Sequence, residues 1–123
     1  MLKIQTRNFG KVAVLCLQGR IVQGERATLR TAVHSQSHVS AIVLDLARVS
    51  TVDAGGLGLM LELRQQIESR GIRFKLMNVS KSVSRVLEVT RLASVFEITS
   101  RGELSPSSSP ARSARMIGFA SCA

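Results

Sequence analysis

The stretch that most constrains what this chain can fold into covers residues 42–60, with the sequence IVLDLARVSTVDAGGLGLM. It opens with an apolar run, continues through a short polar segment to the turn DAGG at residues 53–56, and then has apolar residues at helical spacing as far as Ile67. This pattern predicts a buried strand that turns sharply into a helix. Asp53 is suited to cap that helix, because its carboxylate can accept from backbone N–H groups of the first turn.

Strand and helix signals alternate on both sides of this stretch. The predicted strands are residues 2–6, 11–18, 41–46, 72–77 and 95–98. The predicted helices are a segment from Leu29 to Ser37 or His38, a segment from about Gly56 to Arg70 that Gly71 ends, and a segment after Ser80, which can cap it. The order ββαβαβαβ predicts an α/β fold, in which a mixed, mostly parallel β-sheet opens with an antiparallel hairpin and has helices packed against it.

The composition changes near residue 100. Residues 1–100 are predicted to form one domain, and residues 101–123, which are rich in Ser, Pro and Arg, to form a disordered tail. Met116, Ile117 and Phe119 form a small apolar cluster in this tail. That cluster is compatible with docking on a partner or on the domain, but we prefer the interpretation of an extension without function.

Charge and cysteine usage exclude several classes of protein. The formal net charge is +9, but the 17 Lys and Arg residues are dispersed, with no run of three, and the chain has only four aromatic residues, so no specific nucleic-acid site is predicted. No segment approaches the ~20 consecutive apolar residues of a membrane span, and a cytoplasmic location without membrane association is expected. Cys16 and Cys122 do not indicate a disulfide framework, and Cys16 is interpreted as a small buried apolar residue.

No catalytic or metal-binding pattern is complete in this sequence. No Lys or hydroxyl follows Gly58 at the spacing of a phosphate-binding loop, and the glycines match only part of a dinucleotide fingerprint. His34 and His38 are predicted to share one helix face, but no acidic residue or cysteine nearby completes a zinc site. Asp45 and Asp53 have no catalytic partner beside them. We therefore expect no enzyme activity, no metal and no cofactor.

The stretch at residues 42–60 resembles the core motif of the STAS domain, the family of the bacterial anti-sigma-factor antagonists. In that family a buried strand leads into an Asp-Ser-Ser/Ala-Gly-Leu-Gly turn, and this chain has DAGGLG at residues 53–58. Residues 19–21 and 80–96 also look like the corresponding family segments, so that the resemblance covers about residues 3–98. It implies the STAS fold, with the order of strands and helices given above.

The resemblance also implies a function in protein binding. In the family, the unphosphorylated antagonist docks on an anti-sigma factor, a serine kinase of the GHKL type, and so frees the sigma factor. The kinase phosphorylates the first Ser of the turn, but here Ala54 stands at that position and has no oxygen to accept a phosphoryl group. Ser50 and Thr51, just upstream, are weak candidates for a displaced phosphorylation site, and hydrogen bonds within the turn are their simpler role.

The residues expected to contact the partner come from the turn and from the loop after residue 19, and they are Asp53, Ala54, Gly55, Gly56, Arg20, Val22 and Gln23. The family often carries an Asp where this chain has Val22. The resemblance thus implies an antagonist-like module, a monomer or weak homodimer, that sequesters an anti-sigma factor and regulates transcription without the usual phosphoserine switch. The alternatives are a scaffold subunit of a multi-STAS signalling complex and, less favoured, a nucleotide-binding domain.

Overall fold

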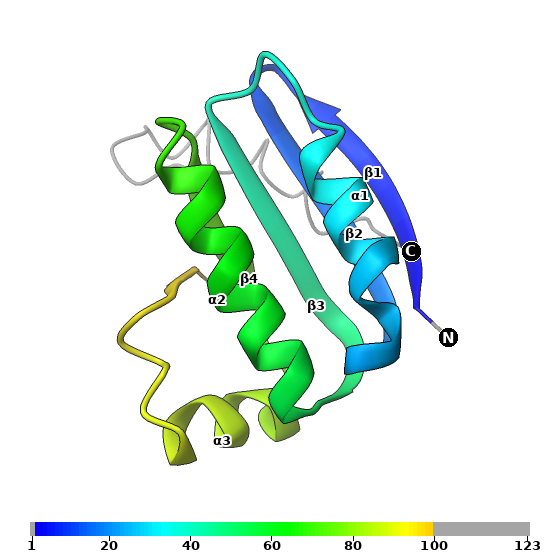
Figure 1. The fold of residues 1–123 in the computed structure, drawn as a ribbon, viewed down its shortest axis with the longest axis vertical. Helices are drawn as coiled ribbons and strands as arrows, with labels where there is room; N and C mark the ends of the chain where they lie inside the picture. The colour runs from blue at the N-terminus through cyan, green and yellow to red at the C-terminus, as the bar shows by residue number, and fades with distance from the viewer. Residues whose placement is uncertain (1, 100–123) are drawn as a thin grey trace, which may run out of the picture.

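The computed structural model describes residues 2–99, which form a five-stranded sheet and three α-helices (Figure 1). The strands are β1 (Lys3–Phe9), β2 (Val12–Ile21), β3 (Ala41–Val52), β4 (Arg73–Met77) and β5 (Glu97–Thr99). The helices are the short 3-10 helix η1 (Gln23–Glu25), α1 (Arg26–His34), α2 (Ala54–Glu68) and α3 (Lys81–Val89). The predicted order ββαβαβαβ is confirmed, whereas the predicted tail, residues 101–123, lies outside the described residues.

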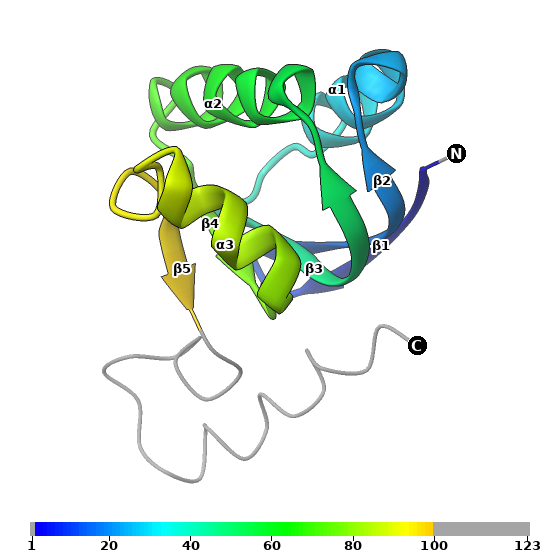
Figure 2. The same cartoon turned by 90° about the horizontal axis from the view of Figure 1, so that it is seen from below.

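The sheet is mixed, as the alternation of strands and helices predicts. Its strands lie in the order β1-β2-β3-β4-β5, with β1 antiparallel to β2 and the other neighbours parallel. The helices α1 and α2 cover one face of the sheet, and α3 lies near the end at which α2 begins (Figures 1 and 2). Each parallel connection therefore carries a helix back along the sheet, which is the usual way to join parallel strands.

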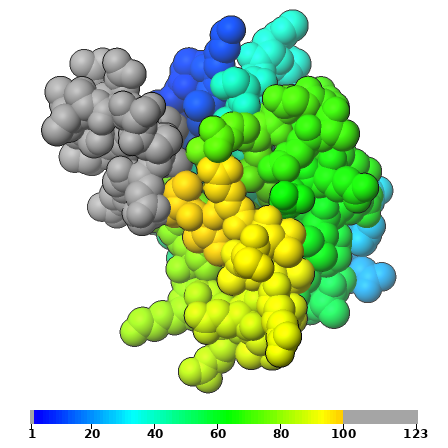
Figure 3. Space-filling model, turned by 90° about the vertical axis from the view of Figure 1, so that its left-hand side faces the viewer, coloured from blue at the N-terminus to red at the C-terminus, as the bar shows by residue number. Residues whose placement is uncertain are grey.

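The main core lies between the sheet and these helices. It takes in the apolar faces of all three helices and the strand residues that point toward them, for example Leu15, Leu44 and Leu76. The segment after α3 completes it, since Phe96 is only 4% exposed and Leu92 packs against the same core. In Figure 3 this segment, drawn in yellow, lies beside α2.

Strand β3 is longer than the sequence predicts, because two bulges interrupt its pattern. Its register with β2 shifts between Cys16 and Gln18 and again between Gly19 and Arg20, with the extra residue on β3 each time. A bulge breaks the alternation of side chains, so the part of β3 after residue 46 resembles a loop in the sequence. The side chain of Asp45, which is only 2% exposed, serves the first bulge by accepting from the backbone N of Ala47 at 2.9 Å.

Helix α1 ends earlier than predicted, and this changes the relation of the two histidines. His38 lies beyond the helix with a φ of 59°, so His34 and His38 do not share a helix face. His34 instead contacts α2, with its Nε2 at 2.8 Å from the Oε1 of Gln66. The prediction was wrong because residues 35–38, which lie beyond the end of α1, were counted as helix.

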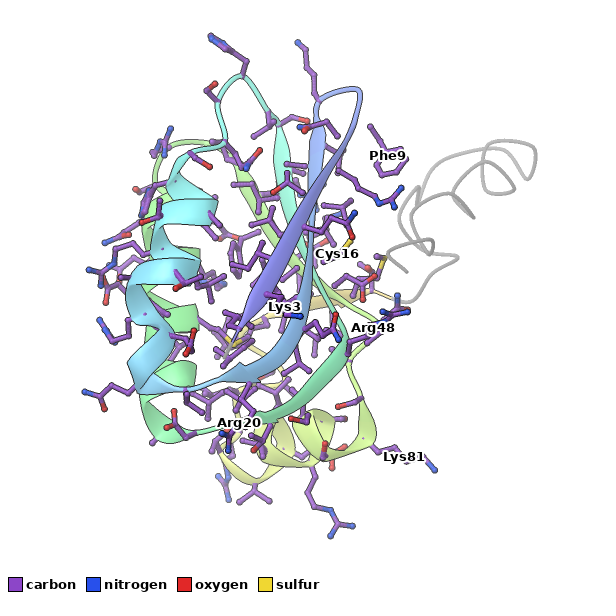
Figure 4. The ribbon with its side chains drawn as sticks, turned by 90° about the vertical axis from the view of Figure 1, so that its right-hand side faces the viewer. Lys3, Phe9, Cys16, Arg20, Arg48 and Lys81 are labelled. Atoms are coloured by element: carbon purple, nitrogen blue, oxygen red, sulfur yellow. The ribbon has the colours of Figure 1, made fainter. Side chains whose placement is uncertain are left out.

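The structure also corrects the interpretation of Cys16 as a small buried apolar residue. It is buried, with 7% of its surface exposed, but it is disulfide-bonded and therefore not simply a buried apolar residue. In Figure 4, Cys16 and Phe9 lie on the side of the sheet away from α1. A disulfide requires proximity in the fold, which the separation of cysteines along the sequence does not reveal.

Candidate functional site

The turn between β3 and α2 is built around Asp53. This residue has an extended backbone, with a φ of −94° and a ψ of −179°, and the helix begins at the next residue. The Oδ1 of Asp53 accepts a hydrogen bond from the backbone N of Gly56 at 2.7 Å. Asp53 is therefore the N-cap of α2, as predicted, and the strand enters the helix without an intervening loop.

Asp53 also joins the turn to the loop that follows β2. Its backbone N donates to the carbonyl oxygen of Ile21 at 3.2 Å, and its Oδ2 accepts from the backbone N of Gln23 at 3.4 Å. Gln23 precedes Asp53 by 30 residues. One carboxylate thus holds together two segments that are distant in sequence, and these are the segments predicted to form the binding surface.

The glycines of the turn differ in what surrounds them. A Cβ atom on Gly56 would overlap the carbonyl oxygen of Ile21, and one on Gly55 would lie 2.7 Å from the Cβ of Gln23. A Cβ on Gly58 would have nothing within 4 Å. The loop after β2 therefore packs against α2 only because residues 55 and 56 have no side chain, whereas residue 58 plays no part in this contact.

Most of the predicted binding residues are accessible. Asp53, Ala54, Arg20 and Gln23 are exposed, Val22 and Gly55 are half-buried, and Gly56 is buried. Figure 4 shows Arg20 at the end of the sheet at which β2 and β3 run into their helices. Ala54, at the first helical position, is thus exposed beside Asp53.

Ser50 and Thr51 lie within β3 and not in a loop. The Oγ of Ser50 donates to the carbonyl oxygen of Gly19 at 3.2 Å, and the carbonyl oxygen of Ser50 accepts from the Oγ of Ser82 at 3.2 Å. Ser50 therefore connects β2, β3 and the first turn of α3. Sequence reasoning did not reveal Ser82 or the carbonyl groups of Gly19 and Ile21, because backbone groups leave no signal in the sequence.

Ion pairs between α1 and α2 fix the loop from a second side. Arg26 and Arg30 on α1 both contact Glu62 on α2, at 3.1 and 2.8 Å between guanidinium nitrogen and carboxylate oxygen. Because α1 follows directly on η1, its attachment to α2 also limits the movement of the loop. The half-exposed position of these side chains means that the pairs contribute modestly to stability.

The chemical groups at this end of the sheet set the kinds of ligand that it can bind. The described residues contain no group of three or more His, Cys, Asp or Glu side chains placed to hold a metal ion. Over the same residues, every helix is too short or too polar to cross a bilayer. What the geometry provides is an exposed surface, made of the turn at residues 53–56 and of Arg20, Val22 and Gln23, which we call the turn surface.

Comparisons with known proteins agree with this geometry. The family model of the STAS domain matches residues 3–110. An anti-sigma factor antagonist from Mycobacterium paratuberculosis is similar in structure, with a TM-score of 0.71, 16% identity, and 96% of this chain and 95% of that chain covered. The antagonist SpoIIAA in its unphosphorylated form has a TM-score of 0.63, 21% identity, and coverages of 94% and 96%.

A third similar structure belongs to a different kind of protein. A sulfate transporter family protein from Wolinella succinogenes has a TM-score of 0.65 and 17% identity, with 91% of this chain and 92% of that chain covered. At these identities a structural likeness shows the fold alone. The fold is therefore shared by proteins with different functions, and the function has to be argued from the turn surface.

Proposed function

This chain belongs to the STAS domain family, and we propose that it is an anti-sigma-factor-antagonist-like binding module. Its partner is an anti-sigma factor of the GHKL serine-kinase type, which it sequesters through the turn surface, and sigma-factor-dependent transcription is regulated in this way. The similarity to two anti-sigma factor antagonists over almost the whole chain supports this proposal. The exposed position of the turn surface supports it independently.

The observation that carries the proposal is the double attachment of the Asp53 carboxylate. One oxygen accepts from Gly56 and the other from Gln23, so the turn and the loop have a fixed relation before any partner arrives. A preorganised surface loses less conformational freedom on binding than a mobile one. The turn surface is accordingly suited to bind a protein without rearrangement.

The same geometry distinguishes this module from one with a phosphorylation switch. Ala54 is exposed at the start of α2 and offers no hydroxyl. A phosphate at this position would add about 1.5 to 2 negative charges, which can remove complementarity with a partner. In this chain that charge cannot be added at residue 54, and we infer that the module stays competent to bind.

The test is binding of the full chain to the GHKL-type kinases of its host, each purified and immobilised separately. The variant Ala54→Asp places a negative charge where the phosphate would be, and an acidic residue in the first helical turn stabilises a helix by about 0.3–1 kcal/mol. It should therefore fold and yet bind at least about tenfold more weakly, a loss of about 1.4 kcal/mol. The matched control is Gln65→Glu, which makes the same change of charge on an exposed residue further along α2.

Two results would contradict the proposal. If Ala54→Asp binds as tightly as the unaltered chain, the docking surface lies elsewhere on the domain. If the unaltered chain binds none of the kinases, it is not an antagonist of this type, and the scaffold function becomes the better hypothesis.

A further inference from the structure

The face of the sheet opposite α1 and α2 carries a second apolar cluster. Its side chains come from β1 to β4, and every helix residue in a buried cluster belongs to the other core. The buried members are Val14, Cys16, Val43 and Met77, with Phe9 and Val12 packed against them. We call this set the helix-free cluster. In Figure 2 its face of the sheet is turned away from α1 and α2.

The members of this cluster are more buried than an open sheet face allows. Val14, Val43 and Met77 are each 0% exposed, although none of the described helices lies over them. On the same face the ammonium group of Lys75 is drawn into an ion pair with Glu97, and this lysine is only 6% exposed. At the edge of the face, the Oγ1 of Thr99 is buried and has no hydrogen-bond partner in the described residues. The described helices and strands therefore do not account for the burial of this face.

The disulfide bond of Cys16 points to one segment of the chain. Cys16 is a member of the helix-free cluster, and it is disulfide-bonded. The sequence has only one other cysteine, Cys122. Apolar residues shortly before it, Met116, Ile117 and Phe119, match the apolar character of the cluster.

The topology of the sheet makes this pairing easy to reach. Thr99 pairs in register with Met77, Met77 with Asp45, and Asp45 with Cys16, so these four residues form one row across the sheet. Three strand spacings of about 4.8 Å separate the ends of the row, about 14 Å in all. Cys122 follows Thr99 by 23 residues, which can span about 75 Å when extended. The segment needs only a small part of that reach to cross from β5 to β2.

We propose that residues 116–122 dock on the helix-free cluster and that a bond between Cys16 and Cys122 fastens them there. Most of residues 101–115, rich in Ser and Pro, then serves as a linker along the sheet. The bond joins the two sulfur atoms and releases two protons and two electrons, which a small-molecule disulfide such as oxidised glutathione takes up as it becomes two thiols. The turn surface lies at the end of the strands and stays uncovered.

A peptide map of the full chain, purified without reductant, tests the pairing directly. Trypsin cleaves after Lys11, Arg20 and Arg115, so Cys16 falls in the peptide VAVLCLQGR and Cys122 in the peptide MIGFASCA. We expect these two peptides to be joined in a monomeric protein and to separate on reduction. Two free thiols, a bond between two copies of the same peptide, or a covalent dimer would each overturn the proposal.

The docking of the apolar residues is tested by titration with glutathione. The double variant Ile117→Ser and Phe119→Ser should lower the equilibrium constant for closing the bond by about tenfold or more, since it removes the apolar groups that hold Cys122 near Cys16. The matched control is Leu104→Ser, which removes an apolar residue from the linker and should leave the constant unchanged. An equal constant for all three proteins would show that residues 116–122 do not dock.

Discussion

The starts of α2 and α3 follow the same local rule but build different surfaces. In each, a side-chain oxygen of the residue before the helix accepts from the backbone N of the third residue along, at 2.7 Å for Asp53 and 3.4 Å for Ser80. At α2, however, the loop after β2 approaches so closely that Gly56 has no room for a Cβ atom. At α3 the contact to the neighbouring strand is made by hydroxyl groups, of Ser80 to Val49 and of Ser82 to Ser50.

We propose that this difference makes the start of α2, and not that of α3, a surface for binding. An N-cap is enough to begin a helix, and α2 and α3 each have one. At α2, Gly55 and Gly56 leave room for the backbone at the end of β2 and the loop after it. The carboxylate of Asp53 then accepts a hydrogen bond from this loop, at Gln23. We therefore expect substitutions at α2 to alter both stability and partner binding, and substitutions at α3 to alter stability alone.

The largest effect is expected for Gly56→Ala. The new methyl group would overlap the carbonyl oxygen of Ile21, and neither backbone can move without disturbing β2 or α2. Overpacking of this kind is expected to lower the free energy of unfolding by at least about 2 kcal/mol. Unfolding in urea, followed by circular dichroism, measures it. An unchanged midpoint would show that the loop after β2 can withdraw at no cost.

A smaller effect is expected for Asp53→Ala, which removes the cap and the attachment of Gln23 together. The loss should be about 1–2 kcal/mol in the free energy of unfolding, together with weaker binding of the proposed kinase partner. The matched control is Ser80→Ala, which should lower stability by about 1 kcal/mol and leave binding unchanged. Our comparison fails if the two variants bind the partner equally well, whatever their stability.

The smallest effect, and one of opposite sign, is expected for Gly58→Ala. This residue is exposed on α2, and a methyl group added to it would have nothing within 4 Å. Replacement of a helical glycine by alanine should raise the free energy of unfolding by about 0.5–1 kcal/mol. A destabilised protein, measured by the same urea titration, would mean that residue 58 also packs against a neighbour.

Local rules explain most of what the sequence could predict. Asp53 and Ser80 were recognised as caps because capping depends on a few consecutive residues, and Gly71, with a φ of 79°, ends α2 for the same kind of reason. The length of β3 was not predictable, because its bulges depend on how it pairs with β2. The bond of Cys16 was missed for a similar reason, since the spacing of cysteines along a sequence does not reveal which residues the fold brings together.

The candidate site shows the same division. The sequence motif indicated both segments of the turn surface, but it did not distinguish the role of Gly56 from that of Gly58. Only the position of the Ile21 carbonyl group separates a glycine that is required from one that is replaceable. Ser50 likewise resembled a loop residue, whereas its hydroxyl is engaged with Gly19 on the neighbouring strand.

The most direct test of the central claim restores the hydroxyl that the turn surface lacks. The proposed partner kinase and ATP are added to the unaltered chain and to Ala54→Ser, and phosphate incorporation and binding are measured for both. We predict that the unaltered chain takes up no phosphate and stays bound. Ala54→Ser should be phosphorylated at residue 54 and then bind at least about tenfold more weakly, a loss of about 1.4 kcal/mol. Phosphate on Ser50 or Thr51 of the unaltered chain, or unchanged binding of phosphorylated Ala54→Ser, would contradict the account.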